Sequence, residues 1–362
     1  MNLHRLQLIT FRNYHSLQLV FPEEGAIFEG INGSGKTNIL EAIYILCTGR
    51  SQRGSKRSEM INFGSDNTYI EGEFKEGDRS AVASMGFSRN KKVVMKFNGV
   101  VVKKFTEWFG KRPVISFGAD DLQLVNGTPE FRRRFLDILC SQTDSGYLTS
   151  LINYKHFLSC RNQILSSNFD KIQCEIYEEQ MAESGAEIFI KRKEIISFLG
   201  PYLQDYYKEI SGNRESAGIL YEPSVSCECS SKNEWKNVFY ELLKERRNRD
   251  LETGFSTVGP HRDDIRFLLN QKPSKTYGSQ GQCRSIVLSL KLSSVSCLEH
   301  FRQDKMIFLI DDALSELDQD RTSRVLPLIE NKGQVFIATP VLNSPMKKTL
   351  LRCKVKDGTV TI

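Results

Sequence analysis

The stretch FEGINGSGKTNIL, residues 28–40, decides how the rest of the chain is interpreted. Its centre fits the pattern G-x-x-x-x-G-K-[ST], in which glycines let consecutive backbone N–H groups converge on phosphate oxygens. The lysine of such a loop reaches the terminal phosphates, and the hydroxyl residue after it ligates Mg²⁺. The alternative is an ordinary glycine turn before a helix. The candidate binding residues are Gly30, Ile31, Asn32, Gly33, Ser34, Gly35, Lys36, Thr37 and Asn38.

The residues on both sides of this loop provide the context that phosphate binding requires. A short apolar run, residues 25–28, precedes the loop and is typical of a strand. After the loop, Ile39, Ile43 and Leu46 recur at helical spacing. A helix that begins here would direct the positive end of its dipole at a bound anion. The pattern therefore predicts a strand, a phosphate loop and a helix over about residues 36–47.

A second part of the site is predicted from the segment MIFLIDDALSELD, residues 306–318. The apolar run 306–310 is typical of a buried parallel strand, and it ends in Asp311 and Asp312. Because α/β folds hold ligands at the carboxyl ends of parallel strands, we expect Asp311 to hold Mg²⁺. We expect Asp312 to orient or activate the attacking water, with Lys36 as the third catalytic residue. A solvated acidic pair after a buried strand is the alternative interpretation.

The length and the distribution of patterns predict two domains. Residues 1–117 and 255–362 carry α/β patterns, with short alternating strands over 69–102, and together would form one ATPase domain. Residues 118–254 would form an inserted, mainly helical lobe, because long helical patterns cover 145–167, 170–199 and 232–249. Short strands are expected near residues 217–229.

Composition excludes several classes of protein. The chain has 362 residues, 40% of them apolar and 26% charged, which is ordinary for a globular protein. The net charge of +6 permits an anionic partner without requiring one. Nine scattered cysteines without a C-x-x-C pair predict free thiols. With no long apolar stretch and no signal-peptide pattern, the sequence predicts a cytoplasmic protein without a membrane span.

The segment YGSQGQCRSIV, residues 277–287, indicates the class of ATPase. Its residues Ser279, Gln280, Gly281 and Gln282 resemble the signature motif of ABC-type ATPases, usually LSGGQ. Ser315 and Asp318, which follow the acidic pair, resemble the D-loop of the same class. The resemblance implies that ATP joins two such subunits, the signature of each facing the nucleotide of the other. The long helical insertion disfavours a transporter subunit, as does Ala338-Thr339-Pro340 at the position of the transporters' switch histidine.

Six segments together resemble the RecF family of bacterial DNA-repair ATPases over essentially the whole chain. They are LQLITFRNY, GINGSGKTNILEAIYIL, GTPEFRRRFLD, TVGPHRDD, YGSQGQCRS and IDDALSELD. The resemblance implies an α/β fold, an ABC-type ATPase domain like an SMC head with an inserted helical lobe. It implies a weak, DNA-stimulated ATPase with ATP and Mg²⁺ as cofactors and an ATP-dependent homodimer. It also implies binding of duplex DNA near gaps and single-strand/double-strand junctions, and a nucleoid-associated location.

By the same resemblance, the partners would be RecR with RecO, and the protein would help them load RecA. An ABC-type regulatory ATPase partner without its own DNA binding is the alternative function. Such a protein would hydrolyse ATP and dimerise, yet it would show no ATP-dependent affinity for DNA.

Several basic or polar residues carry weaker predictions. Arg12 either reaches a phosphate of bound ATP or is an ordinary arginine at a hairpin tip. The segment GPHRDD, residues 259–264, is interpreted as a structural turn or a subunit interface in preference to a metal site. Among the basic clusters, the one predicted to bind DNA phosphates comprises Arg50, Arg53, Lys56 and Arg57. Solvated surface charge is the alternative for every such cluster, including 132–134, 191–193 and 246–249.

Overall fold

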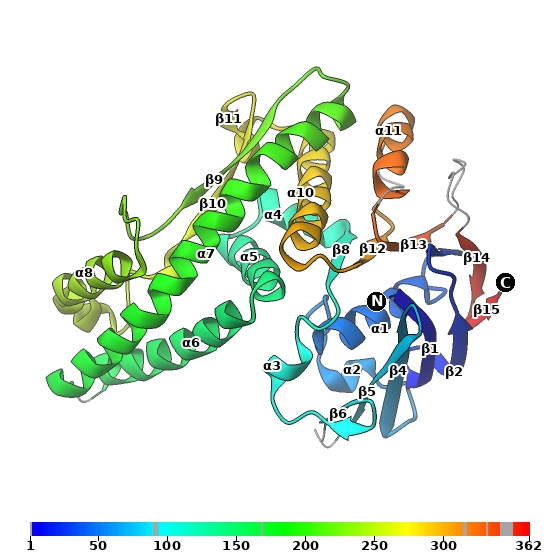
Figure 1. Cartoon of the computed structure of the whole chain (residues 1–362), viewed down its shortest axis with the longest axis horizontal. Coiled ribbons are helices and arrows are strands. Elements are labelled where there is room, and N and C mark those ends of the chain that lie inside the picture. Colours follow the sequence, from blue (N-terminus) through cyan, green and yellow to red (C-terminus); the bar gives the residue numbers. More distant parts are fainter. Residues whose placement is uncertain (1, 90–92, 168, 314–316, 331, 341–349) are drawn as a thin grey trace. The chain divides into compact units, whose positions relative to one another are not determined.

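The computed structural model describes residues 2–89, 93–167, 169–313, 317–330, 332–340 and 350–362. The chain divides into two compact units (Figure 1). Unit 1 comprises Met1–Asp121, Lys208–Arg214 and Val287–Ile362, and unit 2 comprises Leu122–Tyr207 and Glu215–Ile286. These units differ from the predicted domains, because residues 255–286 belong to unit 2. The physical reason is that strand β10, Asp264–Leu269, pairs along its full length with β9, Ala217–Glu222.

Unit 1 contains a sheet whose strands follow the order β15-β14-β3-β13-β12-β8, with every pair parallel except β14–β15. The apolar run 306–310 forms strand β12, as the sequence predicts, and the segment QVFIAT, residues 334–339, forms the neighbouring strand β13, which is buried throughout. The bounds are β3 Gly25–Glu29, β8 Val114–Gly118, β12 Ile307–Asp311, β13 Gln334–Thr339, β14 Leu351–Lys356 and β15 Thr359–Thr361.

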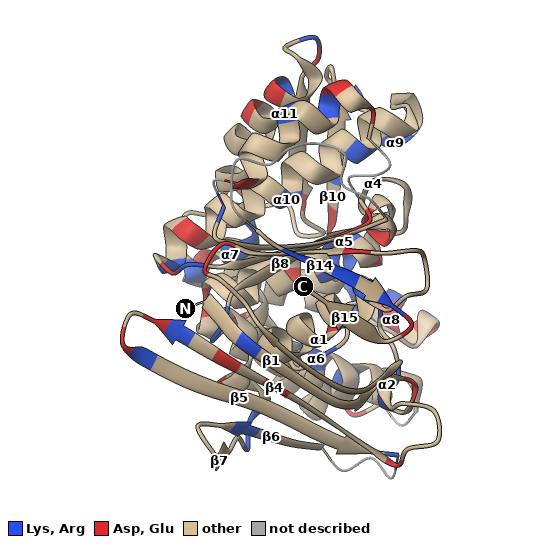
Figure 2. Cartoon of the chain, turned by 90° about the vertical axis from the view of Figure 1, so that its right-hand side faces the viewer, with Lys and Arg blue, Asp and Glu red and all other residues tan. Residues whose placement is uncertain are grey.

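A second sheet of unit 1 is antiparallel, in the order β2-β1-β4-β5-β6-β7. Figure 2 shows acidic and basic residues on neighbouring strands of this sheet, where Arg5 of β1 pairs with Glu71 and Glu73 of β4. The short strands expected over residues 69–102 are present, and neighbouring ones pair as antiparallel hairpins. The bounds are β1 Asn2–Phe11, β2 Tyr14–Val20, β4 Asn67–Glu76, β5 Arg79–Ser88, β6 Val93–Phe97 and β7 Val100–Val101.

Helix α1, Lys36–Thr48, makes contacts with strands of both sheets, and the hydrophobic core surrounds it. Its apolar residues are buried all round, so a single stripe at helical spacing underestimates its burial. Unit 1 also contains the short helices α2, Arg57–Met60, and α3, Phe105–Trp108, and the longer helix α11, Gln319–Glu330. Helix α10, Gln280–Arg302, and the 3-10 turn η1, Ala119–Leu122, cross the boundary between the units.

Unit 2 is mainly helical and contains a three-stranded sheet in the order β11-β10-β9. Helix α7, Lys171–Ser211, continues through Pro201 and past the end predicted near 199. The continuation is explained by burial, because Leu199, Leu203 and Tyr207 keep one face in the core at helical spacing. The remaining elements are α4 Gln123–Asn126, α5 Pro129–Thr143, α6 Ser145–Ser166, α8 Lys232–Thr253, η2 Pro260–Arg262, α9 Ser274–Tyr277 and β11 Lys272–Pro273.

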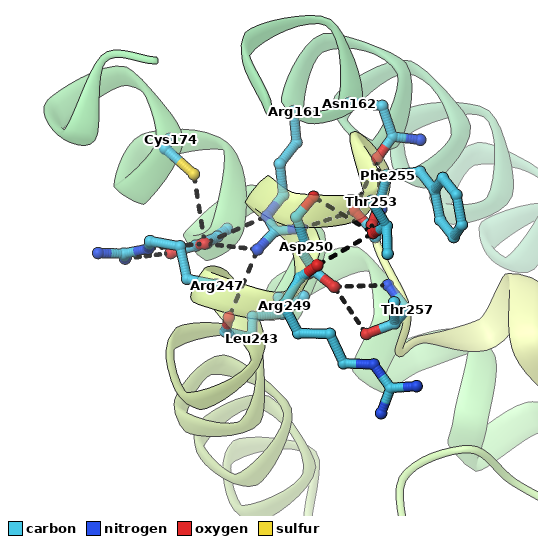
Figure 3. Close-up of polar contacts among 12 residues, drawn as sticks. Arg161, Asn162, Cys174, Leu243, Arg247, Arg249, Asp250, Thr253, Phe255 and Thr257 are labelled. Carbon is cyan, nitrogen blue, oxygen red and sulfur yellow. Dashed lines mark hydrogen bonds and ion pairs between the residues drawn. The ribbon is translucent and has the colours of Figure 1, made fainter. Parts of the chain in front are cut away.

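A buried polar network joins three helices of unit 2 (Figure 3). Arg161 of α6 is fully buried and pairs with Glu178 of α7 at 2.9 Å and with Asp250 of α8 at 2.7 Å. It also donates to Ser256 Oγ at 2.7 Å. Because a buried charge without partners is strongly destabilising, the network fixes how these helices pack.

Cys227 and Cys229 lie beside each other, with Cα atoms 5.1 Å apart. The seven cysteines at the other positions form no disulfide, as predicted.

Candidate nucleotide-binding site

The phosphate loop leaves β3 at Glu29 and enters α1 at Lys36. Gly33 and Gly35 have φ of 83° and 117°, values that side chains with a Cβ rarely adopt. A Cβ on Gly35 would lie 2.5 Å from Asn13 Nδ2, and one on Gly30 would lie 2.2 Å from the carbonyl oxygen of Val355. The sequence therefore needs glycine at these positions to bring the backbone into this tight loop.

Lys36 lies inside the curve of the loop. Its side chain is buried, and its Nζ donates to the carbonyl oxygens of Gly30, at 2.7 Å, and Ile31, at 3.0 Å. The Oγ of Ser34 is also buried and has no hydrogen-bond partner among the described residues. A buried ammonium and an unsatisfied hydroxyl beside a helix N-terminus are groups that a phosphate oxygen would satisfy.

Asn13, which the sequence interpretation missed, supports the loop from the hairpin of β1 and β2. Its Nδ2 donates to the carbonyl oxygen of Ser34 at 3.0 Å, and its Oδ1 accepts from Asn38 Nδ2 at 2.8 Å. Asn38 thus holds the hairpin tip against α1. The sequence carried a signal for this residue only in the polar tip FRNY between two alternating segments.

Asp311 is the last residue of β12, and its Oδ1 accepts a hydrogen bond from Thr37 Oγ1 at 2.7 Å. The fold thus joins two predicted metal ligands that are 274 residues apart in the chain. Burial raises the pKa of Asp311, although the bond from Thr37 and the charge of Arg53 act in the opposite direction. Carboxylate and hydroxyl oxygens are the ligands that Mg²⁺ prefers, so this pair fits the ion with phosphate oxygens and water completing its shell.

Asp312 follows with a φ of 55°, and its N–H donates to the carbonyl oxygen of Ala338 at 2.9 Å. A left-handed conformation in a residue with a side chain costs about 1 kcal/mol or more and is often found at functional sites. Thr37, Asp311 and Asp312 line one pocket of about 280 Å³ at the carboxyl ends of the parallel strands. Gln52 and Arg53 line the same pocket.

Arg12, which was predicted to reach a phosphate of ATP, contacts protein side chains in this structure. Its guanidinium donates to both carboxylate oxygens of Glu41, each at 2.8 Å, and also to Ser55 Oγ at 2.7 Å. Glu41 lies on α1, is fully buried and accepts a further bond from Ser51 Oγ. Sequence reasoning missed Glu41, although a carboxylate within the apolar run NILEAIYIL was a signal. A contact between Arg12 and a phosphate stays a prediction.

The signature residues lie in unit 2 at the start of α10, with Ser279 directly before its first residue. The Oε1 of Gln282 accepts from the Ser279 N–H at 2.7 Å, and Ser279 Oγ accepts from the Gln282 N–H at 3.3 Å. Ser279 and Gln280 are exposed, and Gly281 is half-buried. Of the predicted D-loop, Ser315 lies outside the described residues. Asp318 caps α11 by accepting from the Arg321 N–H at 2.8 Å.

The predicted DNA cluster lies in and before α2 of unit 1. Arg50 stacks on Phe105, with its Cζ 4.8 Å from the ring centroid, and Arg53 lines the nucleotide pocket. Lys56 and Arg57 are exposed. No ion pair joins these four cations to a carboxylate within the described part of the chain, which leaves their charge available.

Other basic clusters have structural partners. Arg132 is buried against Asp264 at 2.6 Å, and Arg192 is buried against Asp263, also at 2.6 Å. Arg247 pairs with Glu178 at 2.5 Å. These arginines are therefore parts of the unit 2 core instead of a surface for anions.

The segment 259–264 is a structural turn. His261 Nδ1 bonds with Tyr154 Oη at 2.6 Å and Nε2 with the carbonyl oxygen of Ser256 at 3.0 Å, while burial lowers the pKa of His261 to about 4. Asp263 accepts from Tyr221 Oη and from the Ser224 N–H. In the described ranges, no group of three or more His, Cys, Asp or Glu side chains is arranged to hold a metal. Nor does any described helix have the length and apolar character needed to cross a membrane.

Comparison with known proteins gives a consistent result. A family described as "RecF/RecN/SMC N terminal domain" matches residues 2–353. The protein from Ligilactobacillus salivarius called "DNA replication and repair protein RecF" is 36% identical, over 98% of this chain and 95% of its own. The protein of the same name from Bacillus cytotoxicus is 34% identical, with coverages of 99% and 98%.

Solved structures agree with this likeness. The recombination mediator protein RecF with ATP, in the RecFOR pathway, matches with a TM-score of 0.89 and 32% identity, over 99% of this chain and 97% of that one. An Smc head bound to the C-terminal winged-helix domain of ScpA matches with a TM-score of 0.58 and 15% identity, over 99% and 97%. The predicted fold, an ABC-type ATPase like an SMC head, is thereby confirmed.

Proposed function

The chain belongs to the RecF family of DNA replication and repair proteins, and on this premise we propose that it is an ATP-driven DNA clamp. Two copies would close on ATP and hold duplex DNA near single-strand gaps. They would help RecO and RecR load RecA, and hydrolysis would then release the DNA. The observation that carries this proposal is the bond between Thr37 and Asp311, which assembles a phosphate loop and a metal-binding acid in one pocket.

The residues of unit 1 divide the chemistry among them. The loop N–H groups and Lys36 bind the β- and γ-phosphates, and the ammonium neutralises charge that grows on the transferring phosphoryl group. Thr37 and Asp311 would hold Mg²⁺, which when bound draws charge from the phosphate oxygens. Asp312 orients the attacking water. The hydrogen bond from its backbone N–H to the carbonyl oxygen of Ala338 holds the backbone from which its carboxylate extends. That hydrolysis is slow and stimulated by DNA is proposed on family membership alone.

Closure of the dimer requires the signature of a second copy. Ser279 and the N-terminus of α10 would contact the γ-phosphate bound by the loop of the partner. Such charge-assisted bonds are lost when the γ-phosphate leaves, which explains why hydrolysis would open the dimer. The exposure of Ser279 and Gln280 supports this role, since a contact made in trans needs side chains that a second subunit can reach.

DNA would be held through its phosphates. Lys56 and Arg57 are exposed, and each contact to a phosphate releases counterions, so affinity should fall steeply with salt. The preference for gaps, a cytoplasmic and nucleoid-associated location, and binding to RecR are proposed on family membership alone.

The test is binding to a labelled gapped duplex at one stated salt concentration, with and without Mg-ATP. We expect binding to require ATP and to be lost in Lys36→Met, which removes the loop cation, and in Ser279→Arg, which blocks the signature. Asp311→Asn should keep nucleotide binding while hydrolysis falls roughly a hundredfold, because the metal ligand is weakened. ATP-dependent dimers that show no ATP-dependent DNA affinity would favour the regulatory ATPase without DNA binding. Normal dimerisation of Lys36→Met would contradict the assigned role of the loop.

A further inference from the structure

Glu215 links the signature to the buried Tyr207 of α7, and all of these residues lie in unit 2. The residue lies between α7 and β9 and is half-buried. Its Oε1 accepts from Gln282 Nε2 at 2.5 Å, and its Oε2 accepts from Tyr207 Oη at 2.8 Å. Tyr207 is fully buried, so one carboxylate oxygen is anchored in the core and the other faces the signature. No sequence motif singles out Glu215.

The bond to Glu215 restrains the side-chain amide nitrogen of Gln282, which the hydrogen bonds within the signature turn do not hold. The side-chain oxygen of Gln282 already accepts a hydrogen bond from the Ser279 N–H, and the backbone N–H of Gln282 donates to Ser279 Oγ. With the amide nitrogen bound to Glu215, both ends of the side-chain amide are fixed. Because Ser279 is bonded to Gln282 at two atoms, fixing Gln282 also fixes the direction of the serine N–H and the position of its Oγ.

We propose that Glu215 is a positioning residue for ATP-dependent dimerisation, holding Gln282 and Ser279 in the orientation that engages the nucleotide of a second subunit. The inference rests on the proposed function, since it assumes that the signature acts in trans. Glu215 itself would not touch the nucleotide. A positioned group meets its partner without first losing rotamer freedom, so the bond should strengthen dimerisation and leave nucleotide binding by a single subunit unchanged.

Three substitutions separate this role from a general loss of structure. Glu215→Ala removes both bonds, and Glu215→Gln keeps an acceptor for Gln282 but removes the charge. Glu222→Gln is the matched control, because Glu222 lies on β9 of the same unit and pairs with the exposed Arg266. Dimerisation is measured by analytical ultracentrifugation in Mg-ATP. Nucleotide binding is measured with a fluorescent ATP analogue, and folding of unit 2 with the NMR signal of fluorine-labelled Trp235.

We expect Glu215→Ala to weaken ATP-dependent dimerisation at least about tenfold, the effect of losing one charge-assisted hydrogen bond. Glu215→Gln should lie between Glu215→Ala and the unmodified protein, and Glu222→Gln should match the unmodified protein. Affinity for the nucleotide analogue should be the same in all of them, because the phosphate loop lies in unit 1.

Mixing two defective proteins tests whether the defect lies in the signature. A dimer of one Glu215→Ala subunit and one Lys36→Met subunit has one intact composite site, formed by the loop of the first and the signature of the second. We therefore expect the mixture to dimerise and hydrolyse ATP better than either protein does alone at the same total concentration. A mixture of Ser279→Arg and Lys36→Met is the reference and should recover in the same way.

The outcomes distinguish the two proposals. If Ser279→Arg is defective and recovers on mixing while Glu215→Ala dimerises normally, the role of Glu215 is overturned and the function stands. The same holds if Glu215→Ala is defective but does not recover on mixing, because its effect would then be structural. If Ser279→Arg itself dimerises normally, the trans arrangement fails, and the inference about Glu215 fails with it.

Discussion

Arg161→Met should destabilise unit 2 by about 3–5 kcal/mol, the usual effect of removing one partner from a buried ion pair. The substitution keeps most of the side-chain volume and removes a fully buried guanidinium that binds Glu178 and Asp250. Glu178 would retain Arg247, at 2.5 Å. Asp250 would retain its bonds from Thr257 but no cation among its described contacts. Most of the loss therefore comes from the uncompensated charge of Asp250.

The measurement uses the two tryptophans, one in each unit. Trp108 lies in unit 1 and Trp235 in unit 2, and both are buried. Fluorine-labelled tryptophan gives one NMR signal for each, so urea unfolding of unit 2 is read directly from Trp235. With a slope of about 2 kcal/mol per molar, the midpoint for Trp235 should fall by ~2 M.

The matched control is Lys232→Met, which removes a cation from the same unit. Lys232 pairs with Glu183 and Glu187, and all three side chains are more than 40% exposed. Its loss should change stability by less than about 1 kcal/mol. If Arg161→Met costs no more than this control, the buried network does not stabilise unit 2 as argued.

The pH dependence gives a second check on the same network. Burial would raise the pKa of Glu178, but the hydrogen bonds from Arg247 and Arg161 outweigh it and hold the pKa below its ordinary value. A lowered carboxyl pKa contributes stability that is present above the ordinary value of 4.5 and is lost as pH falls through the lowered one. The stability difference between the unmodified protein and Arg161→Met should therefore narrow below about pH 4.5. A difference that stays constant down to pH 3 would contradict this.

Two further perturbations follow from buried groups. His261 is neutral in the folded protein, with a pKa lowered from 6.5 to about 4, so the unfolded chain binds its proton first as pH falls. Unfolding free energy should decrease between pH 6.5 and 4 by up to about 1.4 kcal/mol per pH unit from this group, and His261→Gln should remove that slope in urea titrations read at Trp235. Glu41→Gln leaves the guanidinium of Arg12 without a carboxylate and should lower the stability of unit 1 by about 2–4 kcal/mol, read at Trp108. An unchanged midpoint in Glu41→Gln would mean that Arg12 finds another anion.

The sequence by itself determined the parts of the site that are contiguous in the chain. The phosphate loop at 30–37 needs glycines, a lysine and a hydroxyl at fixed spacing, so its chemistry is visible without a structure. The strand that ends in Asp311 is also visible in the sequence, because a continuous apolar run indicates a buried strand whichever strands lie beside it. The signature turn at 279–282 is also local, since its bonds join residues three apart.

Only the tertiary structure decided which distant groups meet. Thr37 reaches Asp311 and Glu215 reaches Gln282 because strand order and helix packing bring them together, and no spacing in the chain encodes either contact. The same reason explains the arginine clusters. Arg132 and Arg192 look like surface charge in the sequence, but the fold buries them against Asp264 and Asp263. Charge is a property of a residue, whereas burial and partner depend on the elements packed around it.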